Sequence, residues 1–242
     1  GTLSLATGQT LTVAGGTTKI GGATLTGSGA RTLSLTGTHT LDVVSNATLP
    51  GGGFVVNPSG TPTLTSSNVS GATLTVASGD TLNLPGATVN ASLSLVNQGT
   101  TVMSNVTDHG TFDNSGTLRV LQGTTATLNG ALSNTSTGLI EVQSSDFCCF
   151  GPSDGTLTVA NGFINNGTIK LQNFSTFGLG TATLNVASGT LSHAGGGLVW
   201  GQLNGMPPDG YTVVGINLPH IVLQPLEGNV QYKTDDIAPV YF

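Results

Sequence analysis

Residues 72–84 read Ala-Thr-Leu-Thr-Val-Ala-Ser-Gly-Asp-Thr-Leu-Asn-Leu, and this stretch decides the fold. Its two segments, Thr73 to Val76 and Thr81 to Leu84, carry apolar side chains at every second position. Alternation with period two is the pattern of a β-strand that buries one face. Gly79 lies between the segments, where a glycine permits a tight corner that a residue with a Cβ atom would resist. The stretch therefore predicts two short strands joined by a corner.

The same unit recurs along the chain. A full copy begins at Thr2 and another at Thr32, and partial copies begin at Thr117, Thr156 and Thr183. The starts are 30, 41, 44, 39 and 27 residues apart, which fits one or two coils of about 20 residues with loops of variable length. A β-sandwich would instead show evenly spaced strands and hairpin turns. Short strands without intervening helices favour a solenoid, so we expect an all-β, right-handed parallel β-helix over residues 1–200.

Composition supports this class and excludes several functions. Charged residues make up 7% of the chain, against roughly 25% in an ordinary domain. The net charge is −6, and there is no cluster of Lys and Arg that could bind nucleic acid or an anionic membrane surface. No apolar run is long enough to span a bilayer. We therefore expect no nucleic-acid partner and no membrane insertion.

Asparagines recur at the expected corners. Asn97, Asn114, Asn134 and Asn166 each lie shortly before a strand led by glycine. Stacked turns can align such residues into a ladder of side-chain amides, and Asn also tolerates the backbone of an isolated turn. The sequence leaves both interpretations open.

Composition changes after residue 200. Residues 201–242 contain no Ser but hold five of the ten Pro and all three Tyr. We expect this segment to be a C-terminal cap on the last coil or a β extension that pairs with another subunit. No comparable cap precedes the first coil, which favours end-to-end stacking. The candidate subunit-pairing residues are Val230, Tyr232, Ile237, Val240, Tyr241 and Phe242.

Two segments give the chain a resemblance to a known group. Gly110 to Val120 reads GTFDNSGTLRV, and Gly162 to Leu171 reads GFINNGTIKL. With the repeats, these resemble the passenger regions of bacterial autotransporters and filamentous-haemagglutinin-type adhesins, over roughly residues 1–200. The resemblance implies a parallel β-helix, export, and an extracellular or cell-surface location. It brings no catalytic residues with it.

Cys148 and Cys149 are the only cysteines, and they are adjacent. They could close a vicinal disulfide, remain free or buried thiols, or form bonds between subunits. Two thiols without a nearby His are too few for a structural zinc site, so we expect neither a metal nor a cofactor.

Catalytic chemistry is not indicated. Polysaccharide-cleaving β-helices need clustered carboxylates for acid/base catalysis. The 11 acids are scattered, and their only adjacent pair is Asp235-Asp236. We therefore expect no enzyme activity.

Thr-x-Thr pairs also recur, at Thr10/Thr12, Thr24/Thr26, Thr38/Thr40, Thr73/Thr75 and Thr156/Thr158. A flat row of such pairs is how some solenoids bind ice. Their irregular spacing favours the simpler explanation, that Thr is a good outward residue in a strand.

The function expected from the sequence is structural. We predict a self-associating subunit of an extracellular filament or surface fibre, whose partners are copies of itself joined end to end. The alternative is a monomeric adhesin or glycan-binding module. Its candidate contact site for surface glycans is the set Phe147, Phe150, Phe174 and Phe177, although packing in the core explains these residues more simply.

Overall fold

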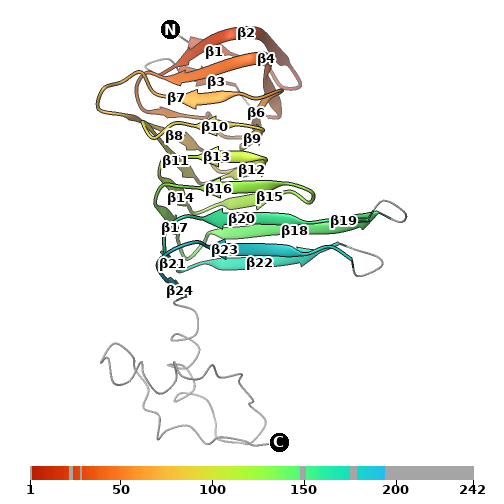
Figure 1. Ribbon diagram of the computed structural model, residues 1–242. Coiled ribbons are helices and arrows are strands. Elements are labelled where there is room, and N and C mark those ends of the chain that lie inside the picture. The colour runs from red at the N-terminus through yellow and green to blue at the C-terminus, as the bar shows by residue number, and fades with distance from the viewer. Residues whose placement is uncertain (1, 22–23, 28, 148–150, 175–178, 194–242) are drawn as a thin grey trace, which may run out of the picture. The chain divides into compact units, whose positions relative to one another are not determined.

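The computed structural model describes residues 2–21, 24–27, 29–147, 151–174 and 179–193, and regular structure among them consists of β-strands alone. The chain winds through three strand positions per turn, which form three faces of a solenoid (Figure 1). Within each face, strands from successive turns pair in parallel. The predicted all-β parallel β-solenoid is confirmed, and its right-handed sense stays a prediction.

Face A is a seven-stranded sheet. It consists of β5 (Ala47–Thr48), β8 (Ala72–Val76), β11 (Leu93–Asn97), β14 (Phe112–Asn114), β17 (Leu132–Asn134), β21 (Phe163–Asn165) and β24 (Leu191–His193). Near the N-terminus, β1 (Thr2–Ser4) and β3 (Thr24–Thr26) pair separately with each other.

Faces B and C belong to one bent 15-stranded sheet, because two long N-terminal strands run through both. These strands are β2 (Thr10–Ile20) and β4 (Arg31–Val43). Face B continues through β6 (Phe54–Pro58), β9 (Thr81–Pro85), β12 (Thr100–Ser104), β15 (Thr117–Val120), β18 (Leu139–Phe147) and β22 (Thr168–Asn173). Face C continues through β7 (Thr63–Thr65), β10 (Thr88–Val89), β13 (Val106–Asp108), β16 (Thr125–Leu128), β20 (Gly155–Val159) and β23 (Ala182–Val186).

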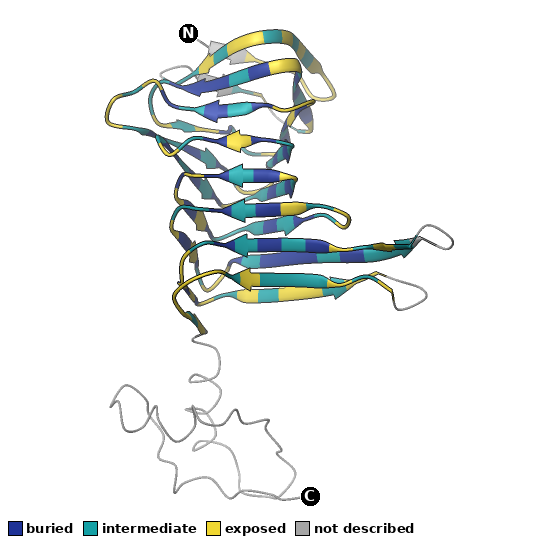
Figure 2. Ribbon diagram, in the orientation of Figure 1, coloured by how far each residue is buried: buried dark blue, intermediate teal, exposed yellow. Residues whose placement is uncertain are grey.

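The core lies between the three faces and is mainly aliphatic. In most strands from β4 to β21, alternate residues point inward and are buried, which Figure 2 shows as repeated dark bands along the strands. Strand register aligns the inward residues of successive turns, as in the row Leu33, Val56 and Leu82 of face B. A fully buried side chain of this size contributes about 1.5–3 kcal/mol. The period-two pattern of the sequence therefore specifies one continuous core.

A ladder of buried asparagines runs along the inner side of face A, from one turn to the next. The Nδ2 group of Asn97 donates to Oδ1 of Asn114 at 2.8 Å, and Asn114 donates to Asn134 at 2.7 Å. Asn134 in turn donates to Asn165 at 2.5 Å. The ladder interpretation holds for Asn97, Asn114 and Asn134, but Asn166 is not a member of the ladder. Strand alternation points Phe163 and Asn165 of β21 inward, so Asn166 is exposed.

Glycines at the corners have two different roles. Gly79 adopts a φ of 84°, as expected for the corner between β8 and β9. Gly116 follows the Asn114 rung, and a Cβ atom there would lie 2.2 Å from the carbonyl oxygen of Gly99 in the preceding turn. Successive corners can therefore stack directly on one another only because they lack side chains.

One turn carries an arm that extends beyond the solenoid. Strand β18 is nine residues long, and its outer end pairs antiparallel with β19 (Gly151–Ser153). Strand β22 follows β18 outward in parallel register as far as Asn173 (Figure 1). The predicted boundary at residue 200, and all of segment 201–242, lie outside the described residues.

Candidate functional site

The candidate disulfide and subunit-pairing residues fall outside the described part of the chain. Cys148 and Cys149 follow β18 in the sequence, within the segment 148–150, which is outside the described residues. The subunit-pairing candidates Val230, Tyr232, Ile237, Val240, Tyr241 and Phe242 lie in segment 194–242. The disulfide and the subunit pairing therefore stay predictions.

The arm carries exposed apolar side chains where the sequence placed an aromatic contact site. Phe174 follows β22 and is 48% exposed, and Leu179 is 54% exposed. The side chain of Phe147, together with Phe150 and Phe177, lies outside the described residues. Phe174 alone thus represents the predicted aromatic cluster in the described structure.

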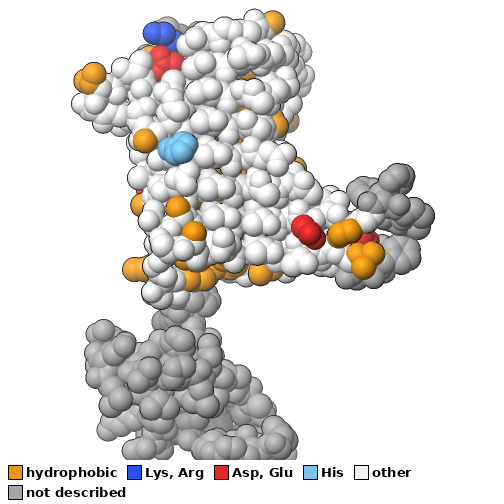
Figure 3. Space-filling model, viewed as in Figure 1, with side chains coloured by type: hydrophobic (Ala, Val, Ile, Leu, Met, Phe, Trp, Pro, Cys, Tyr) orange, Lys and Arg blue, Asp and Glu red, His pale blue; other side chains and the backbone are white. Residues whose placement is uncertain are grey.

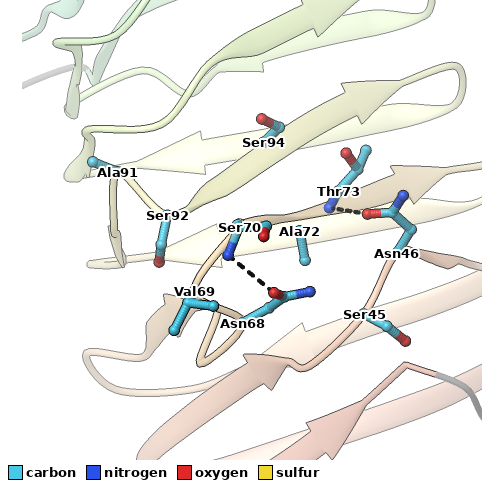
Figure 4. A pocket seen from close by; sticks show the side chains of 11 residues that line it. Ser45, Asn46, Asn68, Val69, Ser70, Ala72, Thr73, Ala91, Ser92 and Ser94 are labelled. Carbon is cyan, nitrogen blue, oxygen red and sulfur yellow. Dashed lines mark hydrogen bonds between the residues drawn. The ribbon is translucent and has the colours of Figure 1, made fainter.

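A hollow of about 860 Å³ lies where the loop after β7 overhangs face A (Figure 4). Its walls come from three successive turns, through Ser45 and Asn46, the loop from Asn68 to Gly71, and Ala91 to Ser94. The hollow could not be predicted from the sequence, because its shape depends on how the loops of three turns lie together. The signal that was present is the turn sequence Asn68-Val69-Ser70-Gly71, which interrupts the alternating pattern.

Two hydrogen bonds, one within a loop and one between turns, shape the hollow. Oδ1 of Asn68 accepts from the backbone N–H of Ser70 at 3.0 Å, and Oδ1 of Asn46 accepts from that of Thr73 at 2.9 Å. Gly71 completes the turn with a φ of 75°. Both carbonyl oxygens are thus engaged, while the two Nδ2 groups have no protein partner among the described residues. These two donors remain available at the wall of the hollow.

The chemistry of the hollow is neutral and polar. Its walls contain amide and hydroxyl groups, no ionisable side chain and no aromatic ring, and Val69 stands fully exposed at the rim. Such a surface can hydrogen-bond a hydroxylated ligand and make one apolar contact. It has no group suited to acid/base or nucleophilic chemistry.

The described carboxylates act chiefly as acceptors that fasten one turn to the next. Asp80 is buried, and its two oxygens accept from the backbone N–H groups of Gly51, Gly53 and Phe54 at 2.7, 3.2 and 2.8 Å. The three N–H groups belong to the preceding turn. Asp80 therefore satisfies donors that burial would otherwise leave unpaired.

Two further acids lie in charged rows on outward positions. Glu141 accepts from Nε of Arg119 at 2.6 Å and lies 3.6 Å from Nζ of Lys170. Burial acts to raise the pKa of Glu141, but the two cations outweigh it and lower the pKa. Asp42 shows the same balance, because the N–H of Ser67 and the ammonium of Lys19 lower its pKa against the effect of burial.

Asp108 is different, because it lies in the core. Strand register places it between Val89 and Leu128 in an inward row of face C. One carboxylate oxygen accepts from the N–H of Gly110 at 2.8 Å, and the other is buried with no hydrogen-bond partner among the described residues. Burial raises the pKa of Asp108 to about 7.

Metal-binding groups and membrane-spanning helices are absent from the described part of the chain. Among the described residues, no group of three or more His, Cys, Asp or Glu side chains could hold a metal ion. The same part of the chain includes no helix with the length and apolar character of a membrane span. The chain matches no protein-family model, no curated protein and no solved structure.

Proposed function

We propose that this chain is a structural, non-catalytic subunit of an extracellular filament or surface fibre, one of the bacterial secreted β-helix repeat proteins. The observation that carries the proposal is that the inward residues and the buried polar groups hold successive turns together. The inward residues form an aliphatic core, the asparagine ladder joins four turns, and the carboxylates of Asp42, Asp80 and Asp154 accept backbone N–H groups from other turns. The core, the ladder and the carboxylates all stabilise the packing of one turn on the next, which is a structural role.

End-to-end association of copies is the form of assembly that we propose. A parallel solenoid has a strand edge at each end, and edges readily pair with another strand. Residues 229–242 contain the apolar tail candidates and supply a segment that could add to such an edge by strand addition. The extracellular or cell-surface location is part of the same proposal and comes from the sequence resemblance.

Electron microscopy of the purified chain at micromolar concentration tests the proposal. Filaments with an axial repeat matching one subunit are expected. Deletion of residues 229–242 should abolish them, whereas the exposed substitution Gln98→Ala should not. Dispersed particles at all concentrations would contradict the self-association.

A glycan-binding module is the second candidate, and the neutral hollow beside face A favours it. Asn46, Asn68 and the neighbouring serines present amide and hydroxyl groups of the kind that bind sugar hydroxyls. A glycan array should then give hits that are lost in Asn46→Ala and Val69→Glu. The surface amide variant Asn83→Ala, which lies on face B, serves as the control. Unchanged hits in all three variants would exclude the hollow as the binding site.

A further inference from the structure

Face C carries a column of threonines that the sequence does not reveal. Register pairs one outward threonine in each of seven successive turns with the next: Thr17, Thr40, Thr63, Thr88, Thr107, Thr127 and Thr158. We call this set the threonine column. Its members are 23, 23, 25, 19, 20 and 31 residues apart, because the loops between turns differ in length. The irregular spacing along the chain thus conceals a regular row in space.

The threonine column differs from the other outward columns in being unbroken over seven turns. In the first three turns, the neighbouring outward position of face C is Lys19, Asp42 and then Thr65. On face B, the comparable outward column holds Thr on six of eight strands, but Val55 and Leu139 interrupt it. Seven threonines in unbroken register occur on face C, whereas the longest such run in the face B column is three.

The side chains of the threonine column point outward, and their hydroxyl groups make no hydrogen bond to another described residue. Thr88 lies between buried Ala87 and Val89, so it points outward, and each other member is likewise half-exposed or exposed. None of the seven hydroxyl groups has a hydrogen-bond partner among the described residues. A β-branched side chain is stiff at χ1, so neighbouring threonines can repeat one arrangement of methyl and hydroxyl groups from turn to turn.

The array extends in a second direction. Thr125 and Thr156 align with each other two residues before Thr127 and Thr158, and Thr183 extends this second row to β23, where Asn185 follows the column. The spacing between turns is about 4.8 Å, and residues i and i+2 of one strand are about 6.7 Å apart. Figure 3 shows the centre of this face free of charged side chains. Outside the Lys19–Asp42 pair of the first two turns, face C therefore offers a row of hydroxyl and methyl groups that widens into two rows at its C-terminal end.

We propose that face C binds ice through the threonine column. Ice is a ligand whose own hydrogen-bonding groups repeat in two directions, and its basal-plane repeat is close to the spacing between the turns. Hydroxyl groups can bond to lattice water, while the methyl groups between them order adjacent water. A rigid sheet has already lost the conformational entropy that a flexible surface would lose on binding. Face B is less suited, because Arg119, Glu141 and Lys170 form a charged row across it.

Measurement of thermal hysteresis and ice-crystal shape with the full 242-residue chain tests the proposal. The unmodified chain should shape growing ice and produce a freezing gap. Thr107→Lys, the fifth of the seven column positions, should remove both effects, because the longer charged side chain lifts the face from a flat lattice. Thr100→Lys makes the same change in the same turn on face B and should leave both effects unchanged.

Two further measurements keep the outcome interpretable. Circular dichroism should show that both lysine variants retain the β spectrum and melting temperature of the parent. Thr107→Ser keeps the hydroxyl group and the fold but removes one methyl group, and it should reduce the freezing gap. Absence of ice shaping in the unmodified chain would overturn the proposal, as would equal loss in Thr107→Lys and Thr100→Lys.

Discussion

Buried asparagines differ from the aliphatic residues around them in what their loss would expose. Asn114 accepts one amide hydrogen bond, donates a second to Asn134 and donates a third to the carbonyl of Leu139 at 3.1 Å. The ladder is therefore a chain of mutually dependent bonds. Removal of one rung leaves polar groups on both neighbours buried and unpaired.

We expect Asn114→Leu to destabilise the protein by about 2–5 kcal/mol, although leucine is more apolar. Each abandoned donor or acceptor costs about 1–3 kcal/mol. Chemical denaturation would measure the change. The matched control is Asn83→Ala, which removes an outward amide pair with Asn57 and should change stability by no more than about 0.5 kcal/mol. Equal effects of the two substitutions would contradict a structural role for the ladder.

Asp108 predicts an unusual pH dependence. Its folded pKa of about 7 lies above the ordinary value of 3.8, because burial disfavours the charged carboxylate. The folded state therefore holds this proton more tightly than the unfolded state does. Its contribution to stability is fully present below about pH 3.8 and is lost as the pH rises through 7. The loss should be on the order of a few kcal/mol.

Asp108→Asn keeps an acceptor for the N–H of Gly110 and cannot ionise. Its melting temperature should vary less between pH 5 and about pH 8 than that of the parent, with the larger gain at the alkaline end. The comparison needs only the difference between the two pH profiles, so other titrating groups cancel. Parallel profiles would show that Asp108 does not titrate in this range.

Corners decide how closely successive elements can stack. The segment that joins β14 to β15 passes so near the turn before it that any side chain on Gly116 would meet the Gly99 carbonyl. This close approach follows directly after the Asn114 rung. The asparagine thus fixes the corner from inside, and the glycine lets the adjacent turn approach it.

Gly116→Ala should therefore destabilise the protein by more than the roughly 1–3 kcal/mol of an overpacked side chain, because the obstacle is backbone. Thermal unfolding would measure the effect. Gln98→Ala changes an exposed side chain at the equivalent corner of the preceding turn and should be neutral. A neutral Gly116→Ala would mean that the corners can separate without loss.

Elements with a strong period were predictable, and their lateral alignment was not. The segments Thr73 to Val76 and Thr81 to Leu84 coincide with β8 and β9 to within one residue, because alternation and a corner glycine act locally. Alignment depends on loop lengths, which differ from turn to turn. For this reason the sequence did not show that Asn165, and not Asn166, joins the ladder. Neither the threonine column nor the hollow near Asn68 could be predicted from it. The buried position of Asp108 was equally hidden, since it occupies an inward site that Val89 and Leu128 fill in adjacent turns.

At the scale of the whole molecule, few charges are available to respond to salt. Arg31 is buried over the ring of Phe54 and donates to two backbone carbonyls, and Asp80 is buried among backbone N–H groups. The described ion pairs are Lys19 with Asp42, and Arg119 and Lys170 with Glu141. Stability rests instead on the core and the parallel ladders. Both are short-range interactions that mobile ions do not screen.

The melting temperature should therefore change by no more than about 4 °C between low salt and 1 M NaCl at constant pH. The expected exception is local. Glu141→Gln removes the shared partner of Arg119 and Lys170, so the destabilisation that it causes should shrink as salt screens the remaining cations. A large salt dependence of the parent that Glu141→Gln leaves intact would place important charge interactions elsewhere. If filaments form as proposed, their assembly should be equally insensitive to salt, because association of uncharged faces and strand edges involves little long-range electrostatic attraction or repulsion.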